Sequence, residues 1–469
     1  MKMSTNTLKT PLALCLLITG LLAMANLNAV SISGEVAGNN GPEAGVWVIA
    51  ETDDLATNFI KIVVTDDDGK FLLPELPDAS YRVWVRGYGL RDSTAVQAQP
   101  GDSLALEVAS AIDEQQAAQI YPSSYWYSLV EPPSLDEFTN PGSQIGGVGS
   151  AMHSQEAYID SLKQNCELCH QLGNKLTREV GHIRHLFEST EEAWSNRVNF
   201  GQYGGWMNRT LATMGRERTI AMYADWTDRI TAGEVPASPP RPQGEERNVV
   251  LTLWDWGNDT SFVHDEVVTD KRNPRVNADG PFYGVSESDG VLVVVDPNTH
   301  VARELEVPMR TRGEAIHDFV TSPFWGDEEV FRGQNAADTH NPMMDHKGRV
   351  WMTSRVRIES NTDDCKAGST NPSAEYFPLN SSSRHVSYFD PDTEEMTLID
   401  TCYSTHHLQF ASDSDDTLWF SGDTQAVGWI NTRLWDETGD ELGSQGWCPT
   451  VIDTNGDGVI TRPWNEPGQ

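Results

Sequence analysis

Basic side chains are scarce in this sequence. Its 469 residues include 33 lysines and arginines against 69 aspartates and glutamates, so the formal net charge is -36 at pH 7. A protein that binds nucleic acid needs a positively charged surface to meet the phosphates. The composition therefore argues against nucleic acid as a partner. The length predicts two to four domains.

Long hydrophobic runs are also missing beyond the N-terminus. Residues 12–24 form one apolar run, which follows Lys2 and Lys9 and is too short for a good membrane-spanning helix. This order is typical of a secretory signal peptide, which we assign to residues 1–29. The alternative is an uncleaved membrane anchor. We expect a mature protein without a membrane span that is periplasmic or secreted.

Cysteine is sparse, with six residues, and Cys15 falls within the expected signal peptide. Disulfides form in the oxidising compartments outside the cytoplasm. A disulfide between Cys365 and Cys402 is one pairing that this allows, with Cys448 left over, but the sequence alone does not fix which of the three cysteines pair. Several catalytic motifs are absent as well, namely the Gly-x-Ser-x-Gly elbow, the phosphate-binding loop and the dinucleotide glycine pattern. The sequence gives no reason to expect a serine triad or nucleotide-driven chemistry.

Residues 30–108 predict a small β-sandwich. Short strand-like runs, bounded by glycine and proline, occur at 31–36, 45–50, 62–65, 70–73 and 81–88. Asp68-Gly69 is typical of a hairpin turn. With Ile32-Ser33-Gly34 and residues 81–85, the segment 68–71 resembles the carboxypeptidase regulatory-like domain, an immunoglobulin-like module. The resemblance implies a role in spacing or adhesion, without catalytic residues.

A helical region is expected at residues 151–235, where segments 155–164 and 220–230 show helix-like apolar spacing. It lies between a mixed linker at 109–150 and a proline-rich connector at 236–244. Tyr125-Trp126-Tyr127 within the linker is expected to dock on a neighbouring domain.

The sharpest motif is Cys166-Glu167-Leu168-Cys169-His170. On a helix, positions i, i+3 and i+4 share one face, so Cys166 and Cys169 can bond to haem while His170 meets the iron. This is the attachment signature of c-type cytochromes, and it predicts one covalent haem c. A thioredoxin-like pair and half of a zinc site are the alternatives, but no βαβ unit or second Cys/His pair at suitable spacing supports them.

The helical region resembles a class I cytochrome c domain, which implies an axial methionine in a loop before the closing helix. Met207 is expected to be that sixth iron ligand, and Met214 is the second choice. Met222 is expected to pack in the core. His182 or His185 would instead give a bis-histidine haem.

Residues 245–469 predict a β-propeller, of which about three blades are visible, whereas a closed propeller usually needs at least four. Either the N-terminal part contributes strands or the chain is a piece of something longer. Related strands occur at 290–297, 348–353 and 416–422, with a period of roughly 65–75 residues. Asp296-Pro297 and Asp390-Pro391 are expected to begin the turns of outer hairpins. This region resembles the propellers of the streptogramin-lyase group.

Four histidines begin or precede the repeated strands, namely His264, His340, His406 and His407. Three carboxylates lie near them in the sequence, namely Asp265, Glu266 and Asp345. Together these side chains predict a metal or substrate site in the central channel. The interpretation that we favour from the sequence, however, is that the histidines hydrogen-bond to backbone within the blade cores.

Asp453, Asn455 and Asp457 match the first ligand positions of a calcium loop. Trp464 stands at the twelfth position in place of the usual Glu, although Glu466 is a substitute. The alternative is a plain Asp/Asn/Gly turn.

The fold expected is multidomain and mainly β: an immunoglobulin-like sandwich, a helical cytochrome c-like domain and a propeller. This order resembles a family of large bacterial carboxypeptidase regulatory-like proteins with an attached haem motif. We expect an exported monohaem cytochrome that exchanges electrons with a redox protein or a small-molecule donor, as the haem module of a propeller oxidoreductase. One alternative is a propeller lyase of the streptogramin-lyase type that uses a histidine and a divalent ion. Another is a calcium-dependent binding protein of the cell envelope.

Overall fold

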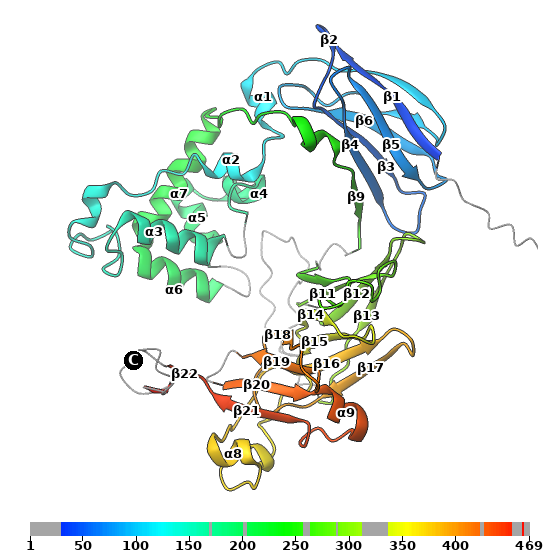
Figure 1. The fold of residues 1–469 in the computed structure, drawn as a ribbon. Coiled ribbons are helices and arrows are strands. Elements are labelled where there is room, and N and C mark those ends of the chain that lie inside the picture. The colour runs from blue at the N-terminus through cyan, green and yellow to red at the C-terminus, as the bar shows by residue number, and fades with distance from the viewer. Residues whose placement is uncertain are drawn as a thin grey trace, which may run out of the picture.

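The computed structural model describes residues 30–167, 171–199, 204–256, 263–287, 289–311, 336–422, 426–452 and 462–463. Residues 1–29, assigned to the signal peptide, lie outside this part. The described chain is mainly β, with a helical region between two β regions (Figure 1). None of the described helices is both long and apolar enough to cross a membrane.

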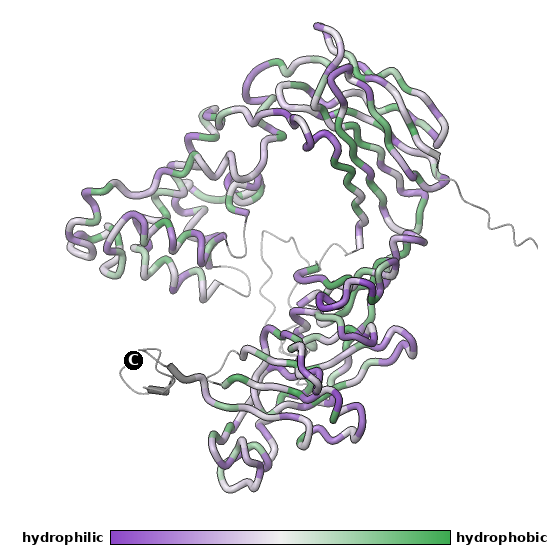
Figure 2. The backbone as a smooth tube through the Cα atoms, in the orientation of Figure 1, coloured by the Kyte–Doolittle hydropathy of each residue, from purple (hydrophilic) through white to green (hydrophobic). Residues whose placement is uncertain are grey.

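Two sheets form the N-terminal region, and every strand expected between residues 31 and 88 is present. The strands are β1 (Val30–Gly38), β2 (Gly41–Pro42), β3 (Trp47–Thr52), β4 (Phe59–Val64), β5 (Lys70–Leu76), β6 (Tyr81–Arg86), β7 (Val96–Ala98) and β8 (Ser103–Glu107). One sheet has the order β2-β1-β5, with β8 parallel to β1, and the other has the order β7-β6-β3-β4-β9. Buried residues alternate along β4 and β6, so each strand sends one face into a shared core. Figure 2 shows apolar residues along these strands.

The last strand of that second sheet comes from much later in the chain. Strand β9 (Leu251–Trp254) lies in the segment assigned to the propeller, yet it pairs antiparallel with β4, opposite Phe59–Ile62. A sheet edge offers unpaired backbone groups to any extended segment that reaches it, so local sequence does not specify this pairing. The ring of Trp254 packs against Phe59 and against Phe282 of the next β region. β9 therefore joins the first β region to the last.

The helical region begins earlier than residue 151. Its helices are α1 (Glu114–Ala118), α2 (Ser123–Tyr127), η1 (Leu135–Phe138), α3 (Gln155–Ser161), η2 (Leu162–Cys166), α4 (Lys175–Arg178), η3 (Gly181–Leu186), α5 (Thr190–Arg197), α6 (Gly204–Met214) and α7 (Arg216–Thr231). Phe138 and Tyr127, from the expected linker, pack on the same core as Tyr158. The indole N–H of Trp226 donates to the carbonyl oxygen of Trp126 at 3.1 Å. The aromatic triplet of the linker docks as expected, and much of the linker belongs to the helical core.

Three four-stranded antiparallel sheets follow, each built from consecutive strands, and we use blades 1 to 3 only as labels for them. Blade 1 contains β10 (Asp265–Val267), β11 (Phe282–Ser286), β12 (Val291–Asp296) and β13 (Val301–Glu306). Blade 2 contains β14 (His340–Met344), β15 (Val350–Ser354), β16 (His385–Asp390) and β17 (Glu395–Ile399). Blade 3 contains β18 (His407–Phe410), β19 (Thr417–Ser421), β20 (Ala426–Asn431) and β21 (Gln445–Pro449). First strand β14 contacts both β10 and β18, so the first strands of the three blades lie together.

The repeat predicted from sequence is partly out of register. The strand expected at 290–297 is the third of its blade, whereas those at 348–353 and 416–422 are second strands. Both positions are central in a sheet and read as short apolar runs, so their patterns look alike. The Asp-Pro turns are equivalent, because each joins a third strand to a fourth. In both turns the aspartate accepts a backbone N–H two residues later, with Asn298 and Asp392 as donors.

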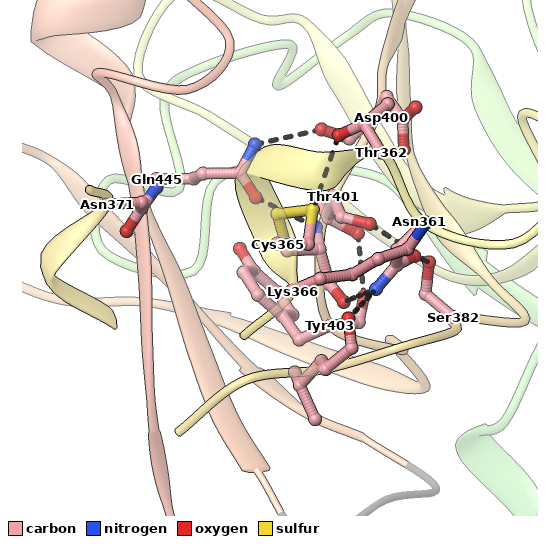
Figure 3. Close-up of a disulfide and its surroundings, with 12 residues drawn as sticks. Asn361, Thr362, Cys365, Lys366, Asn371, Ser382, Asp400, Thr401, Tyr403 and Gln445 are labelled. Carbon is pink, nitrogen blue, oxygen red and sulfur yellow. Dashed lines mark hydrogen bonds between the residues drawn. A yellow bond between two sulfur atoms is a disulfide. The ribbon is translucent and has the colours of Figure 1, made fainter. Parts of the chain in front are cut away.

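The predicted disulfide between Cys365 and Cys402 is confirmed, and both residues are buried in the core of blades 2 and 3 (Figure 3). The side chain of Asn361 donates to the Cys402 carbonyl at 2.6 Å, and Gln445 accepts the Cys402 backbone N–H at 3.0 Å. Cys448 is left outside any disulfide with the other described cysteines, as expected. The remaining elements are η4 (Gly244–Asn248), η6 (Asp363–Cys365), α8 (Pro372–Tyr376), α9 (Thr432–Thr438), β22 (Val451–Ile452) and β23 (Arg462–Pro463).

Candidate functional site

Each blade places a histidine where its first strand begins. His264 directly precedes β10, His340 opens β14, and His406 and His407 stand at the start of β18. The backbone N–H groups of His264 and His406 donate in the same way to the second strands of their blades, to Val285 and Ser421. Because the first strands lie together, equivalent positions on them converge. The structure thus unites all four histidines that the sequence singled out.

The imidazole rings form a contiguous group centred on His340. Its ring centroid lies 4.8 Å from that of His264, 4.6 Å from His406 and 5.3 Å from His407. One nitrogen from each of His340, His406 and His407 can be chosen so that all three atoms lie within 4.8 Å of one another. The same holds for one ligand atom each from His264, Asp265 and His340. We call these five residues the histidine cluster.

Asp265 connects two histidines of different blades. Its Oδ2 atom lies 3.1 Å from Nδ1 of His264 and 3.5 Å from Nε2 of His340. The same oxygen accepts the backbone N–H of Asn341 at 3.1 Å. The carboxylate is therefore fixed in place before any ligand binds.

His340 is the most buried member of the cluster, at 4% exposure, whereas His264 and His407 are exposed. Burial lowers the pKa of His340 to about 4, and the neighbouring charge of Arg384 adds to this, so the imidazole is neutral at pH 7. Its Nδ1 atom lies 3.4 Å from the carbonyl oxygen of His406. This contact is of the kind expected if the histidines bond to backbone. The grouped ligand atoms are of the kind expected for a metal or substrate site, so the structure contains a feature of each interpretation.

Three carboxylates were proposed beside the histidines. Asp265 lies among them, whereas Glu266 and Asp345 belong to no such group of the described residues. Glu266 is the middle residue of β10 and is exposed. Asp345 stands beyond the opposite end of β14 from His340, in the turn before β15, and is fully buried. There it accepts from Nε of Arg349 at 2.7 Å and from the indole of Trp351 at 2.9 Å. Asp345 therefore stabilises a turn, which corrects the expectation that it shares the histidine site.

Sequence reasoning missed Arg384, which precedes β16 and approaches the cluster closely enough to lower the pKa of His340. Its guanidinium pairs with Asp338 at 2.9 Å and with Glu287 from blade 1. Its Nη1 atom is buried and has no hydrogen-bond partner among the described residues. Nothing in the local sequence distinguishes this arginine, because its partners come from distant segments.

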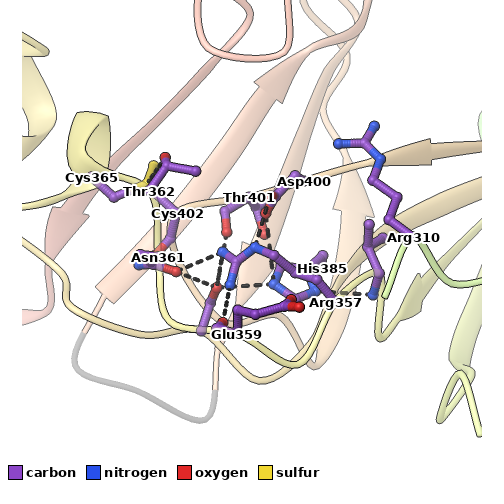
Figure 4. Close-up of polar contacts among 12 residues, drawn as sticks. Arg310, Arg357, Glu359, Asn361, Thr362, Cys365, His385, Asp400, Thr401 and Cys402 are labelled. Carbon is purple, nitrogen blue, oxygen red and sulfur yellow. Dashed lines mark hydrogen bonds and ion pairs between the residues drawn. A yellow bond between two sulfur atoms is a disulfide. The ribbon is translucent and has the colours of Figure 1, made fainter. Parts of the chain in front are cut away.

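Ser382, His385 and Asp400 lie near one another and superficially resemble a catalytic triad. Figure 4 labels His385 and Asp400. The Nε2 atom of His385 is 3.0 Å from Oγ of Ser382 and 3.7 Å from the Asp400 carboxylate. However, Nδ1 of His385 accepts the backbone N–H of Val356 at 3.1 Å, so the ring proton resides on Nε2. Since Nε2 is already protonated, it cannot take the serine proton.

Arg357 completes this group by donating to Asp400 at 2.7 Å and to Asn361 at 2.7 Å. With His385 fully buried, the group is a structural network at the disulfide.

Of the three residues expected to hold the haem, only Cys166 is described, because Cys169 and His170 lie outside the described residues. Cys166 ends η2 and packs, half-buried, against the helical core. It forms no disulfide with another described cysteine. Burial raises the pKa of Tyr223 well above its usual range, and the adjacent Cys166 thiol adds to the shift. Cys166 thus lies beside Tyr223 of α7.

The two candidate axial methionines lie on one helix, α6, which contacts η2. Met207 is within the helix rather than in a loop, and it packs half-buried against the core that Cys166 contacts. Met214 is the last residue of α6 and is fully buried in that core. Met222 is buried in α7, as expected. His185 is exposed in η3, which also contains His182.

The calcium candidates Asp453, Asn455 and Asp457 lie outside the described residues, as do Trp464 and Glu466. They remain predictions from the sequence.

Comparison with protein-family models and with curated proteins finds no match for this chain. Among solved structures, streptogramin B lyase is 13% identical over 38% of this chain and 53% of that protein, with a TM-score of 0.16. The extracellular domain of a protein described as a one-component system of B. thetaiotaomicron is 13% identical over 39% of this chain and 25% of that chain, with a TM-score of 0.15. The matches thus cover about half and a quarter of these two proteins. With TM-scores this low, they carry no argument about function.

Proposed function

We propose that this protein is a lyase whose reaction takes place at the histidine cluster. The observation that carries the proposal is the convergence of His264, His340, His406 and His407 at the starts of three successive blades. The sequence resemblance to the streptogramin-lyase propellers implies a histidine and a divalent ion. The cluster offers both a set of ligands and exposed imidazoles.

A lyase cleaves a bond by elimination, without adding water. His407 is exposed and stacks on His406 at 4.2 Å between ring centroids, so it is the general base in this proposal. Its imidazole accepts a proton from the carbon next to a carbonyl; the C–H electrons form a double bond, and the neighbouring C–O bond breaks. The leaving oxygen then takes up a proton. A divalent ion, held by residues of the cluster, would supply Lewis acidity against the negative charge that develops on the carbonyl oxygen.

The test uses a streptogramin B antibiotic as the probe and mass spectrometry as the readout. Elimination opens the ring to a product of unchanged mass, whereas hydrolysis adds the mass of one water. We expect the isobaric product, and a loss of about 100-fold or more in kcat for His407→Gln. His153→Gln, at an exposed histidine of the helical region, is the matched control and should retain full activity. Absence of turnover, or a hydrolysed product, would contradict the proposal for this probe.

A second function is proposed for the helical region, as an exported c-type haem module. The observation that favours it is the contact between η2, which ends at Cys166, and α6, which carries Met207 and Met214. Cys166 and Cys169 would hold the porphyrin, His170 would bind the iron, and Met207 would be the sixth ligand. A haem supplies one-electron transfer to a redox protein or a small-molecule partner.

The burial of Cys166 and of the two methionines indicates whether a haem would fit between them. Cys166 and Met207 are both half-buried on one core, which suits a group that is partly covered by protein. Met214 is fully enclosed, so Met207 is the better candidate. Expression in an exporting host with the cytochrome c maturation machinery should give Soret and α bands and a covalent mass increase of one haem. The Cys166→Ala/Cys169→Ala variant should lose both, and a wild-type protein without the added mass would refute this proposal.

A further inference from the structure

The surroundings of His340 point to a ligand beyond the substrate of the proposed lyase. A neutral imidazole carries one N–H and one lone pair. Here both ring nitrogens face acceptors: the His406 carbonyl lies 3.4 Å from Nδ1, and the Asp265 carboxylate lies 3.5 Å from Nε2. A cation held between the Nε2 atom of His340 and the Asp265 carboxylate would fit this geometry, because the Nδ1 side of the ring already faces the His406 carbonyl.

We infer that one divalent transition-metal ion, of the Zn²⁺ class, binds between His264, Asp265 and His340. Their ligand atoms lie within 4.8 Å of one another, and a carboxylate oxygen lies 3.1 and 3.5 Å from the two imidazoles. Ligands about 2.1 Å from a tetrahedral zinc ion are about 3.4 Å apart, so small side-chain rotations suffice. In this arrangement Nδ1 of His340 donates to the His406 carbonyl, a typical contact that orients a metal-bound histidine.

The ligand chemistry decides the class of ion. Two imidazole nitrogens and one carboxylate favour zinc, nickel, cobalt or copper, whereas magnesium and calcium prefer sites made of oxygen atoms. Three protein ligands leave a fourth position for water or substrate, as in catalytic zinc sites. His406 and His407 then lie beside the ion rather than around it. For its catalytic meaning the inference rests on the proposed lyase function, to which it adds the identity of the ion and of its ligands.

The experiment measures metal binding on the full-length processed chain, prepared with its haem if it carries one. Zinc is titrated in competition with a chromophoric chelator, and magnesium and calcium are titrated separately. We expect zinc to bind at this site, with affinity reduced at least 10-fold in His264→Gln and in Asp265→Asn. Both positions are partly solvent-accessible, so these variants should fold, as far-UV circular dichroism will check. The matched control His153→Gln should bind zinc like the wild type.

Cobalt substitution distinguishes this site from the cysteine motif. An ion bound by nitrogen and oxygen gives visible ligand-field bands without the near-ultraviolet sulfur charge-transfer band of a cysteine site. We expect the ligand-field bands to persist in Cys166→Ala/Cys169→Ala and to disappear in Asp265→Asn. Unchanged zinc affinity in both His264→Gln and Asp265→Asn would overturn the inference.

The His407→Gln variant separates the two proposals. If it binds zinc like the wild type but loses turnover, both proposals stand. If the wild type binds zinc at the cluster and shows no lyase activity, the metal site stands and the function fails. If turnover persists in Asp265→Asn without zinc, the function stands and the metal site fails.

Discussion

The carboxylate of Asp265 in blade 1 lies 3.5 Å from the Nε2 atom of His340 in blade 2. This approach across the blade boundary is the central relationship in the histidine cluster. It brings an acceptor against a buried imidazole whose other nitrogen already faces a carbonyl oxygen.

Zinc is expected to stabilise the folded protein through this pair. An ion that binds only the native state at 100 times its Kd adds about 2.7 kcal/mol to the free energy of unfolding. Urea unfolding with zinc and with EDTA should show this gain in the wild type. Asp265→Asn at the same zinc concentration should show almost none, because the bridging charge is lost. An equal gain in both proteins would place the zinc elsewhere.

Asp345→Ala is expected to lower the free energy of unfolding by about 3–5 kcal/mol, because it leaves the buried Arg349 guanidinium without one of its partners. Arg349 is 6% exposed and also pairs with Asp436 at 2.6 Å. Urea denaturation measures the change. The control is Asp363→Ala, whose carboxylate is fully exposed beside Lys366 and should change stability by less than about 0.5 kcal/mol. Similar losses in both variants would contradict the prediction.

Stability is expected to fall with acidification because of His385. Burial, with Arg357 and other arginines nearby, lowers the pKa of His385 to about 3 in the folded state, against about 6.5 in the unfolded chain. The unfolded chain thus binds the extra proton between these values. The contribution of His385 is complete above pH 6.5 and is lost towards pH 3, by about 1.4 kcal/mol per pH unit.

Urea unfolding at pH 7, 6, 5 and 4 measures this slope. His385→Gln should give a shallower slope than the wild type, whereas His153→Gln should follow the wild type. Parallel slopes for His385→Gln and the wild type would mean that the buried imidazole does not resist protonation.

Removal of the disulfide in Cys365→Ala/Cys402→Ala is expected to cost about 4 kcal/mol. The two cysteines are 37 residues apart, and this value follows from the chain-entropy account of a cross-link of that length. Urea denaturation of the two proteins measures the loss, and a reducing agent should destabilise the wild type alone. Cys448→Ala is the control, because Cys448 forms no disulfide with another described cysteine.

The sequence by itself determined the local elements. The alternation of apolar residues in β4 and β6, the apolar face of α7 and the paired Asp-Pro turns all depend on neighbouring residues, so their patterns are legible along the chain. The histidines at the blade starts converge because equivalent strands repeat the same position, although the sequence favoured backbone hydrogen bonding as their role. The Cys365–Cys402 disulfide could be proposed because only three cysteines remained once Cys15 was assigned to the signal peptide and Cys166 and Cys169 to the haem motif.

Tertiary structure alone decided which distant segments become partners. It placed β9 at the edge of the first β region, set Asp265 between His264 and His340, and moved Asp345 to a buried turn at the other end of its strand. Each of these outcomes depends on contacts between residues far apart in the chain. A sheet edge can pair with any extended segment, and a carboxylate can accept from any donor that the fold brings near it. Such contacts leave no periodic pattern in the sequence, and they govern the geometry on which a metal site depends.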